Sequence, residues 1–121
     1  MKNSDAVSEL ETLRQRLREF SDARDWEQFH SPKNLAMALA AEAGELLEIF
    51  QWLTEEQSRE LPAEAKAKVR EEIADVLLYL VRLGDQLDID PAAAARDKLA
   101  VNEKKYPAEK ARGNAKKYTE L

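Results

Sequence analysis

Two pairs of carboxylates are the residues of this sequence whose types and spacing could do chemistry. Glu42 and Glu45 lie three positions apart, and so do Glu72 and Asp75. On a helix, side chains at this spacing project from one face about a turn apart. Each pair could therefore share one cation, and two such pairs on adjacent antiparallel helices could converge on it.

Acidic side chains on helices usually face solvent, but the residues that neighbour these two pairs argue against that reading. Leu39 and Leu46 flank the first pair, and no Lys or Arg occurs from Asn34 to Glu56. Asp75 directly precedes the apolar run Val76-Leu77-Leu78. Acids at the edge of a buried face need a compensating cation, because an unpaired charge is costly to bury.

The chain offers only hard oxygen ligands for such a cation. It has no cysteine and a single histidine, His30, which excludes thiolate and multi-histidine metal centres. A four-helix di-iron site is excluded as well, because it needs Glu-x-x-His on two helices. Carboxylates suit Mg²⁺ or Mn²⁺, and Mg²⁺ is commonly completed by phosphate oxygens and water. We therefore expect Mg²⁺, with Mn²⁺ possible, and a phosphate ester as ligand.

Hydrophobic periodicity predicts four helices to position these residues. We expect them at residues 4–23, 32–52, 63–87 and 92–106, with a loop at 54–62 and a basic tail at 108–121. Ser31-Pro32 and Asp90-Pro91 each combine a capping side chain with a first-turn proline. No segment has the period-two alternation of a strand. The predicted class is all-α, a four-helix bundle in a single domain spanning residues 1–121.

The third predicted helix is apolar on nearly all sides from Val76 to Leu83, so it must be covered all round. Ala40, Ala41, Ala43 and Gly44 would also let another helix approach closely. A chain of 121 residues has a modest core of its own. We expect a homo-oligomer, a dimer or a tetramer, assembled through helix packing between subunits.

Charge and hydropathy exclude several classes of partner. The net charge of -5 argues against a nucleic acid. No window is apolar enough for a membrane span, and the first residues lack a signal-peptide core. We expect no nucleic-acid or membrane partner and a cytoplasmic location.

Motifs along nearly the whole chain resemble a known family. They are Arg24–His30, Pro32–Leu35, Glu42–Leu46, Phe50–Trp52, Glu71–Leu77, Tyr79-Leu80, Asn102–Pro107, Arg112–Asn114 and Lys117-Tyr118. Their order and spacing are similar to the MazG-like all-α nucleoside triphosphate pyrophosphohydrolases, in the dCTP pyrophosphatase branch.

The resemblance implies a reaction and a catalytic set. Glu42, Glu45, Glu72 and Asp75 would hold Mg²⁺ against the phosphates while an activated water attacks the α-phosphorus and releases pyrophosphate. The expected substrates are nucleoside triphosphates, chiefly dCTP or related pyrimidine deoxynucleotides, in house-cleaning of the nucleotide pool. Which carboxylate would act as general base stays open, as does the number of metal ions.

The resemblance also implies a substrate-binding set, comprising aromatic residues for base or sugar and polar residues for the nucleotide and its phosphates: Trp26, Trp52, Tyr79, Asn102, Lys105, Lys33, Lys117 and Tyr118. Taken singly, the aromatic residues could equally be packing anchors and the lysines solvated side chains. His30 is interpreted as a helix-entry residue rather than a base.

One position departs from the animal dCTP enzymes. They have a histidine three residues before the phenylalanine that corresponds to Phe20, where this chain has Leu17. A polar nucleoside contact is absent, which leaves the base preference open.

Two rival functions remain. A non-enzymatic helical interaction protein would leave both acidic pairs solvated, and metal dependence would distinguish it from an enzyme. A nucleotide-binding regulator would retain metal and ligand without turnover, and product analysis would distinguish it.

Overall fold

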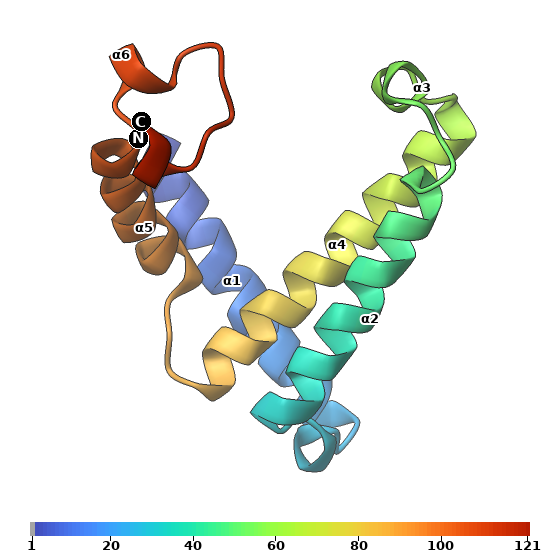
Figure 1. Ribbon diagram of the computed structural model, residues 1–121. Helices are drawn as coiled ribbons and strands as arrows, with labels where there is room; N and C mark the ends of the chain where they lie inside the picture. Colours follow the sequence, from blue (N-terminus) through green and yellow to red (C-terminus); the bar gives the residue numbers. More distant parts are fainter. Residues whose placement is uncertain (1) are drawn as a thin grey trace. The chain divides into compact units, whose positions relative to one another are not determined.

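The computed structural model describes the backbone of residues 2–121 and the side chains from residue 9 onward, and all regular elements in these residues are helical (Figure 1). They are α1 (Lys2–Ala23), the 3-10 helix η1 (Glu27–Phe29), α2 (Pro32–Phe50), α3 (Glu55–Arg59), α4 (Ala63–Gln86), α5 (Pro91–Lys105), α6 (Ala108–Ala111) and the 3-10 helix η2 (Tyr118–Glu120). The predicted all-α class and its four long helices are confirmed. The chain divides into two compact units, residues 1–89 and 90–121.

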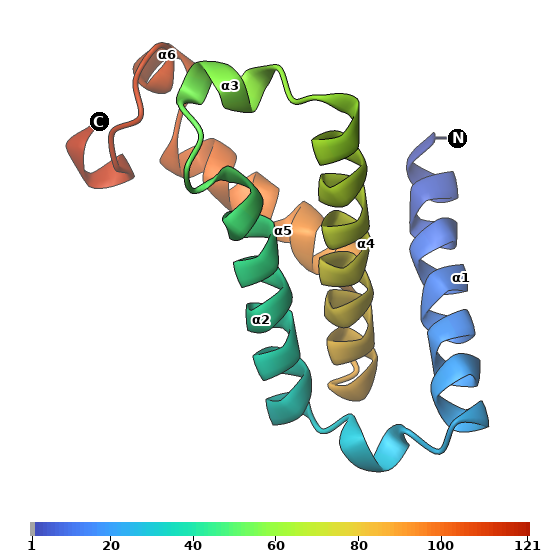
Figure 2. The ribbon, with the colours of Figure 1, turned by 90° about the vertical axis from the view of Figure 1, so that its right-hand side faces the viewer.

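The first unit is built on the antiparallel hairpin of α2 and α4, and α1 packs against α4. Figure 2 shows α2 and α4 running side by side along their length. Leu35 of α2 and Val81 of α4 are each only 1% exposed and form the centre of the core. This hairpin is the element that brings the two carboxylate pairs face to face.

The predicted cap-then-proline signals begin two of the long helices. Ser31 Oγ accepts a hydrogen bond of 3.2 Å from the backbone N–H of Asn34, and Pro32 occupies the first turn of α2. Asp90 Oδ1 accepts a bond of 3.0 Å from the N–H of Ala92 at the start of α5. Each cap satisfies a backbone donor that the helix itself leaves unpaired.

The prediction of a plain loop at 54–62 is wrong, because α3 forms within it. Thr54 Oγ1 accepts from the N–H of Gln57 at 3.1 Å, and Gln57 Oε1 accepts from the N–H of Thr54 at 3.0 Å. This reciprocal pair is a capping box, and its Thr-x-x-Gln signature is present in the sequence. The polar composition of the segment concealed a helix that is stabilised at its first turn.

The second unit contains α5 and the basic tail at 108–121. The tail forms two short helical elements, α6 and η2. The rings of Tyr106 and Tyr118 meet edge to face at 6.2 Å, and Lys105 Nζ lies 4.8 Å from the centre of the Tyr118 ring. Gly113 has φ +79°, a left-handed conformation that glycine adopts readily. Aromatic and cation–π contacts thus hold η2 against the end of α5.

The core of a single chain is thin. Among the described side chains, several large apolar ones on α2 and α4 are exposed, namely Met37, Leu47, Ile73, Leu77 and Leu80. The predicted burial of the segment Val76–Leu83 on all sides is therefore incomplete within one chain. Apart from its chain neighbours and the adjacent backbone of α2, no atom of the described structure comes within 4 Å of the place where a Cβ on Gly44 would lie. In the described residues, no helix has the length and hydropathy to span a membrane.

Candidate active site

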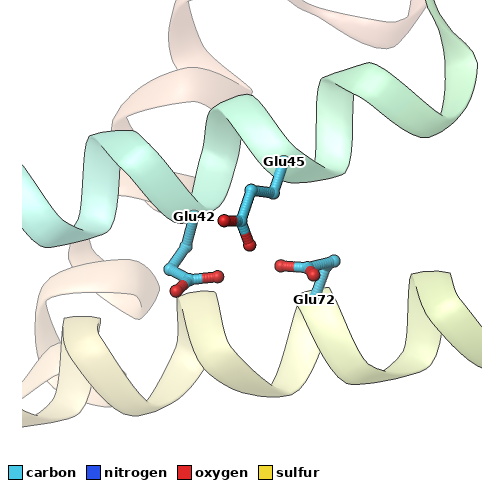
Figure 3. A group of neighbouring side chains, drawn as sticks. All are labelled: Glu42, Glu45 and Glu72. Carbon is cyan, nitrogen blue, oxygen red and sulfur yellow. The ribbon is translucent and has the colours of Figure 1, made fainter.

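Three of the four predicted metal ligands converge between α2 and α4. Glu42 and Glu45 project from α2 toward Glu72 on α4, as Figure 3 shows. One carboxylate oxygen from each residue lies within 4.8 Å of the others. The spacing of three residues along α2 and the antiparallel pairing with α4 produce this cluster, which could bind a metal ion.

Mutual repulsion and hydrogen bonding alter the titration of this cluster. The pKa of Glu42 is raised because its carboxyl shares a hydrogen bond with Glu72, because it is partly desolvated, and because Asp75 and Glu72 carry like charges nearby. The pKa of Glu45 is raised chiefly by its hydrogen bond and charge interaction with Glu42. Without a cation, the cluster therefore favours retention of a proton.

Two oxygens of the cluster are buried without a partner. Glu42 Oε2 and Glu72 Oε2 have no hydrogen bond, and no ion pair involves Glu42, Glu45 or Glu72 among the described residues. Buried acceptors in this state carry an unmet desolvation cost. A divalent cation with a preference for oxygen would meet that cost, so this donor set fits Mg²⁺ or Mn²⁺.

Asp75 lies about one turn after Glu72 on α4 and is placed differently from the other three. It is outside the group whose oxygens approach within 4.8 Å, but its negative charge contributes to the raised pKa of Glu42. It also lines a neighbouring pocket that contains Trp26 and Tyr79. Asp75 thus connects the carboxylate cluster with an aromatic pocket.

That pocket has a volume of about 160 Å³ and a largely apolar lining. The lining consists of Leu17, Phe20, Ser21, Trp26, His30, Leu35, Asp75, Leu78, Tyr79 and Arg82. The Trp26 ring meets Phe20 edge to face at 5.5 Å and is 41% exposed, so it is held yet accessible. The structure therefore brings together two predicted nucleoside contacts, Trp26 and Tyr79, and places Leu17 in the same pocket.

Two polar residues of this pocket, Arg82 and His30, were not predicted to be functional. Arg82 is 3% exposed, and its Nε donates a hydrogen bond of 3.1 Å to Nδ1 of His30. Burial lowers the pKa of His30, and the positive charge of Arg82 lowers it further. An arginine within the apolar part of a helix was the available signal, because a buried cation needs specific partners.

The predicted substrate residues Trp52 and Lys33 do not line this pocket. Trp52 is 87% exposed and follows α2, whereas Trp26 precedes it. Because α2 has 19 residues, its ends are about 28 Å apart. Lys33 is exposed in the first turn of α2. Within one subunit, Trp26 and Trp52 therefore lie at opposite ends of a helix.

The remaining predicted substrate residues belong to the second unit. Asn102 lies on α5 and its carbonyl accepts from the N–H of Tyr106 at 2.8 Å. Lys105 and Tyr118 are in contact with each other, and Lys117 directly precedes η2. Three of these four residues thus gather around the contact between the end of α5 and the C-terminal 3-10 helix.

Comparisons with known proteins agree with the helical fold. A family model described as the MazG-like family matches residues 37–121. The chain belongs to the MazG-like family.

Its curated relatives include dCTP pyrophosphatase 1 of Homo sapiens, 44% identical over 114 residues, and that of Mus musculus, 45% identical over 114 residues. Each alignment covers 93% of this chain and 67% of the relative. A crystal structure of a pyrophosphatase from Archaeoglobus fulgidus superposes with a TM-score of 0.77 at 47% identity, covering 82% of this chain and 93% of that one. The predicted family, its dCTP pyrophosphatase branch and the predicted enzyme class, a pyrophosphohydrolase, are confirmed.

Proposed function

We propose that this chain hydrolyses nucleoside triphosphates to the monophosphate and pyrophosphate in a reaction that requires Mg²⁺, with dCTP or a related pyrimidine deoxynucleotide as preferred substrate. The proposed role is house-cleaning of the cytoplasmic nucleotide pool. The observation that carries the proposal is a pair of buried, partnerless carboxylate oxygens on Glu42 and Glu72, adjoining an aromatic pocket. The relatives named dCTP pyrophosphatase 1 support the choice of substrate.

The four carboxylates Glu42, Glu45, Glu72 and Asp75 would hold the metal. When bound, Mg²⁺ neutralises the charge of the phosphate oxygens and makes water more acidic. The carboxylates have two further tasks. They fix the position of the phosphates relative to the pocket, and one of them accepts the proton of the attacking water.

The pocket would take only the base of the nucleotide. Its volume of about 160 Å³ is well below the roughly 300–1,000 Å³ of sites that enclose a whole drug-sized ligand. Trp26 offers a flat ring for stacking, and Tyr79 packs beside the nucleoside. With Asp75 at the boundary, sugar and triphosphate would extend toward Glu42 and Glu45.

The complete site would include a second copy of the chain. Trp52 lies too far from Trp26 to touch the same nucleotide within one subunit, and the exposed apolar residues of α2 and α4 offer a surface for assembly. A homodimer, or a tetramer built from it, would cover that surface. Lys33, Asn102, Lys105, Lys117 and Tyr118 would then approach the nucleotide and its phosphates.

The test is release of pyrophosphate from a panel of ribo- and deoxynucleoside triphosphates, with Mg²⁺ and with a chelator. The double variant Glu42→Gln, Glu45→Gln should lose the activity. Glu9→Gln, at an exposed position of α1, is the control and should retain it. Metal-dependent pyrophosphate from the native protein alone supports the proposal, and no release from any triphosphate contradicts it.

A further inference from the structure

The contact between Arg82 and His30 fixes the tautomer of the imidazole, so that one known ring nitrogen of His30 is a hydrogen-bond donor in the aromatic pocket. We propose that Arg82 holds His30 in its Nε2–H form and that this N–H selects the base, by donating to the acceptor nitrogen N3 of cytosine. This inference rests on the proposed function, because it assumes that the pocket takes the base.

The direction of the hydrogen bond fixes the tautomer of His30. A guanidinium can only donate, so Nδ1, 3.1 Å from Arg82 Nε, must be the acceptor and carries no proton. Ser21 Oγ lies 3.4 Å from the same nitrogen and can also donate to it. The neutral ring then carries its single proton on Nε2. A doubly protonated ring would set an N–H against the N–H of Arg82.

Arg82 is itself held in place by two carboxylates. Its Nη1 donates to Asp85 Oδ2 at 3.2 Å, and its Nη2 pairs with Glu27. The other oxygen of Glu27 accepts a bond of 3.0 Å from Gln86 Nε2. Arg82 and Asp85 side chains are 4% and 5% exposed. The guanidinium therefore has little freedom to release Nδ1, which makes Arg82 a positioning residue.

The Nε2–H group of His30 is available to a ligand. No hydrogen bond to this atom exists among the described side chains, although the imidazole lines the pocket. The ring stands edge to face against Trp26 at 6.1 Å. A base stacked on Trp26 would thus lie beside a donor that has no hydrogen-bond partner among the described side chains.

A single fixed donor in an apolar pocket discriminates between bases. At position 3, cytosine presents an acceptor nitrogen, whereas uracil and thymine present an N–H. Because O2 is an acceptor in all three bases, the discrimination requires that His30 faces N3. A mismatched donor facing His30 would leave two N–H groups unpaired in a desolvated site, which is costly. Leu17 contributes no polar group to the same pocket, whereas His30 offers a donor whose identity its contact with Arg82 fixes.

The first test reads the tautomer directly, because His30 is the only histidine of the chain. Long-range ¹H–¹⁵N correlation on protein without a histidine tag should show an unprotonated Nδ1 and a protonated Nε2 near neutral pH. Addition of dCMP should shift the Nε2 signal more than addition of deoxyribose 5-phosphate does. A protonated Nδ1, or ring signals unchanged by dCMP, would overturn the inference.

The second test separates donation from packing. His30→Leu should lower kcat/KM for dCTP by about tenfold, the worth of one hydrogen bond, and should reduce the ratio of dCTP to dUTP turnover. His30→Gln places an amide N–H near the position of Nε2 and should restore much of that ratio. Equal losses for all bases in both variants would indicate a structural role and overturn the inference.

The two proposals can fail separately. Pyrophosphate release by the native protein together with an unchanged base ratio in His30→Leu would reject the role of His30 alone. Absence of pyrophosphate from every triphosphate would reject the proposed function and, with it, a base-selecting role for His30.

Discussion

A carboxylate oxygen of Glu72 on α4 lies within 4.8 Å of one of Glu42 on α2, and this approach raises the pKa of Glu42 above its ordinary value. The pair joins the two helices of the hairpin at the proposed metal site. Like-charged groups meet there at a cost that a cation would remove.

The first prediction concerns stability against pH. Because the folded-state pKa values of Glu42 and Glu45 are raised, their contribution to stability is complete below the unfolded pKa and is lost as pH rises through the folded pKa. In the presence of a chelator, the melting temperature of Glu42→Gln relative to that of the native protein should therefore rise as the pH increases from acidic to neutral. Thermal melts followed by circular dichroism measure the difference.

Mg²⁺ should close this gap at neutral pH by stabilising the native protein, because it binds the folded state. Glu9→Gln, at an exposed position of α1, should follow the native profile throughout. Identical pH profiles for native protein and Glu42→Gln would contradict the assigned repulsion.

The second prediction concerns Asp75, which lies between the cluster and the pocket. Asp75→Asn removes one charge while nearly preserving shape, so we expect a fall in kcat/KM of about 100-fold, equivalent to about 2.7 kcal/mol of lost transition-state stabilisation. Steady-state pyrophosphate release measures it. Asp97→Asn on α5 is the control, and full activity of Asp75→Asn would remove this residue from the metal site.

The third prediction concerns Asp85, which accepts hydrogen bonds from Arg14, Arg18 and Arg82. Asp85→Ala would leave the buried Arg82 short of a counter-charge, so we expect a loss of about 3 kcal/mol in the free energy of unfolding. Urea denaturation measures this loss. Arg18, with a side chain 53% exposed, should cost under about 1 kcal/mol when replaced by alanine. Equal losses in the free energy of unfolding for Asp85→Ala and Arg18→Ala would contradict the assigned central role of Asp85 in this ion-pair network.

The fourth prediction concerns Gly44, which lies on the same face of α2 as the exposed residues Met37 and Leu47. Beyond its chain neighbours and the adjacent backbone of α2, a methyl group there meets no described atom of its own chain within 4 Å. Alanine favours a helix over glycine by about 1 kcal/mol. If copies pack through this face as proposed, Gly44→Ala should weaken assembly without reducing helix content. Light scattering over a dilution series measures the oligomer, with Ala111→Gly as a control distant in sequence. Unchanged assembly would place the interface elsewhere.

The helices and the carboxylate cluster could be predicted because their signals are local. Periodic leucines, the caps at Ser31 and Asp90, and the spacing of Glu42 and Glu45 each involve residues within a turn or two. The capping box at Thr54 and Gln57 was equally local and was missed only because the segment is polar.

The polar side of the pocket could not be predicted in the same way. Arg82 and His30 are 52 positions apart, and nothing in either neighbourhood specifies that they meet. Their contact depends on how α4 packs against the segment between α1 and α2. Likewise, the family resemblance implies that Trp26 and Trp52 both contact the nucleotide, whereas the length of α2 separates them within a subunit.

All four carboxylates lie on one helical hairpin, α2 and α4, connected through the short helix α3. Contacts between neighbouring helices close only short loops, so such a hairpin forms early and at low entropic cost during folding. The cluster at Glu42 and Glu72 would then be assembled as soon as this hairpin closes, before the C-terminal unit has to fold. Sequence changes in the α3 connection would alter the rate of that closure only slightly, which gives evolution freedom to vary the connection while the carboxylates stay in register.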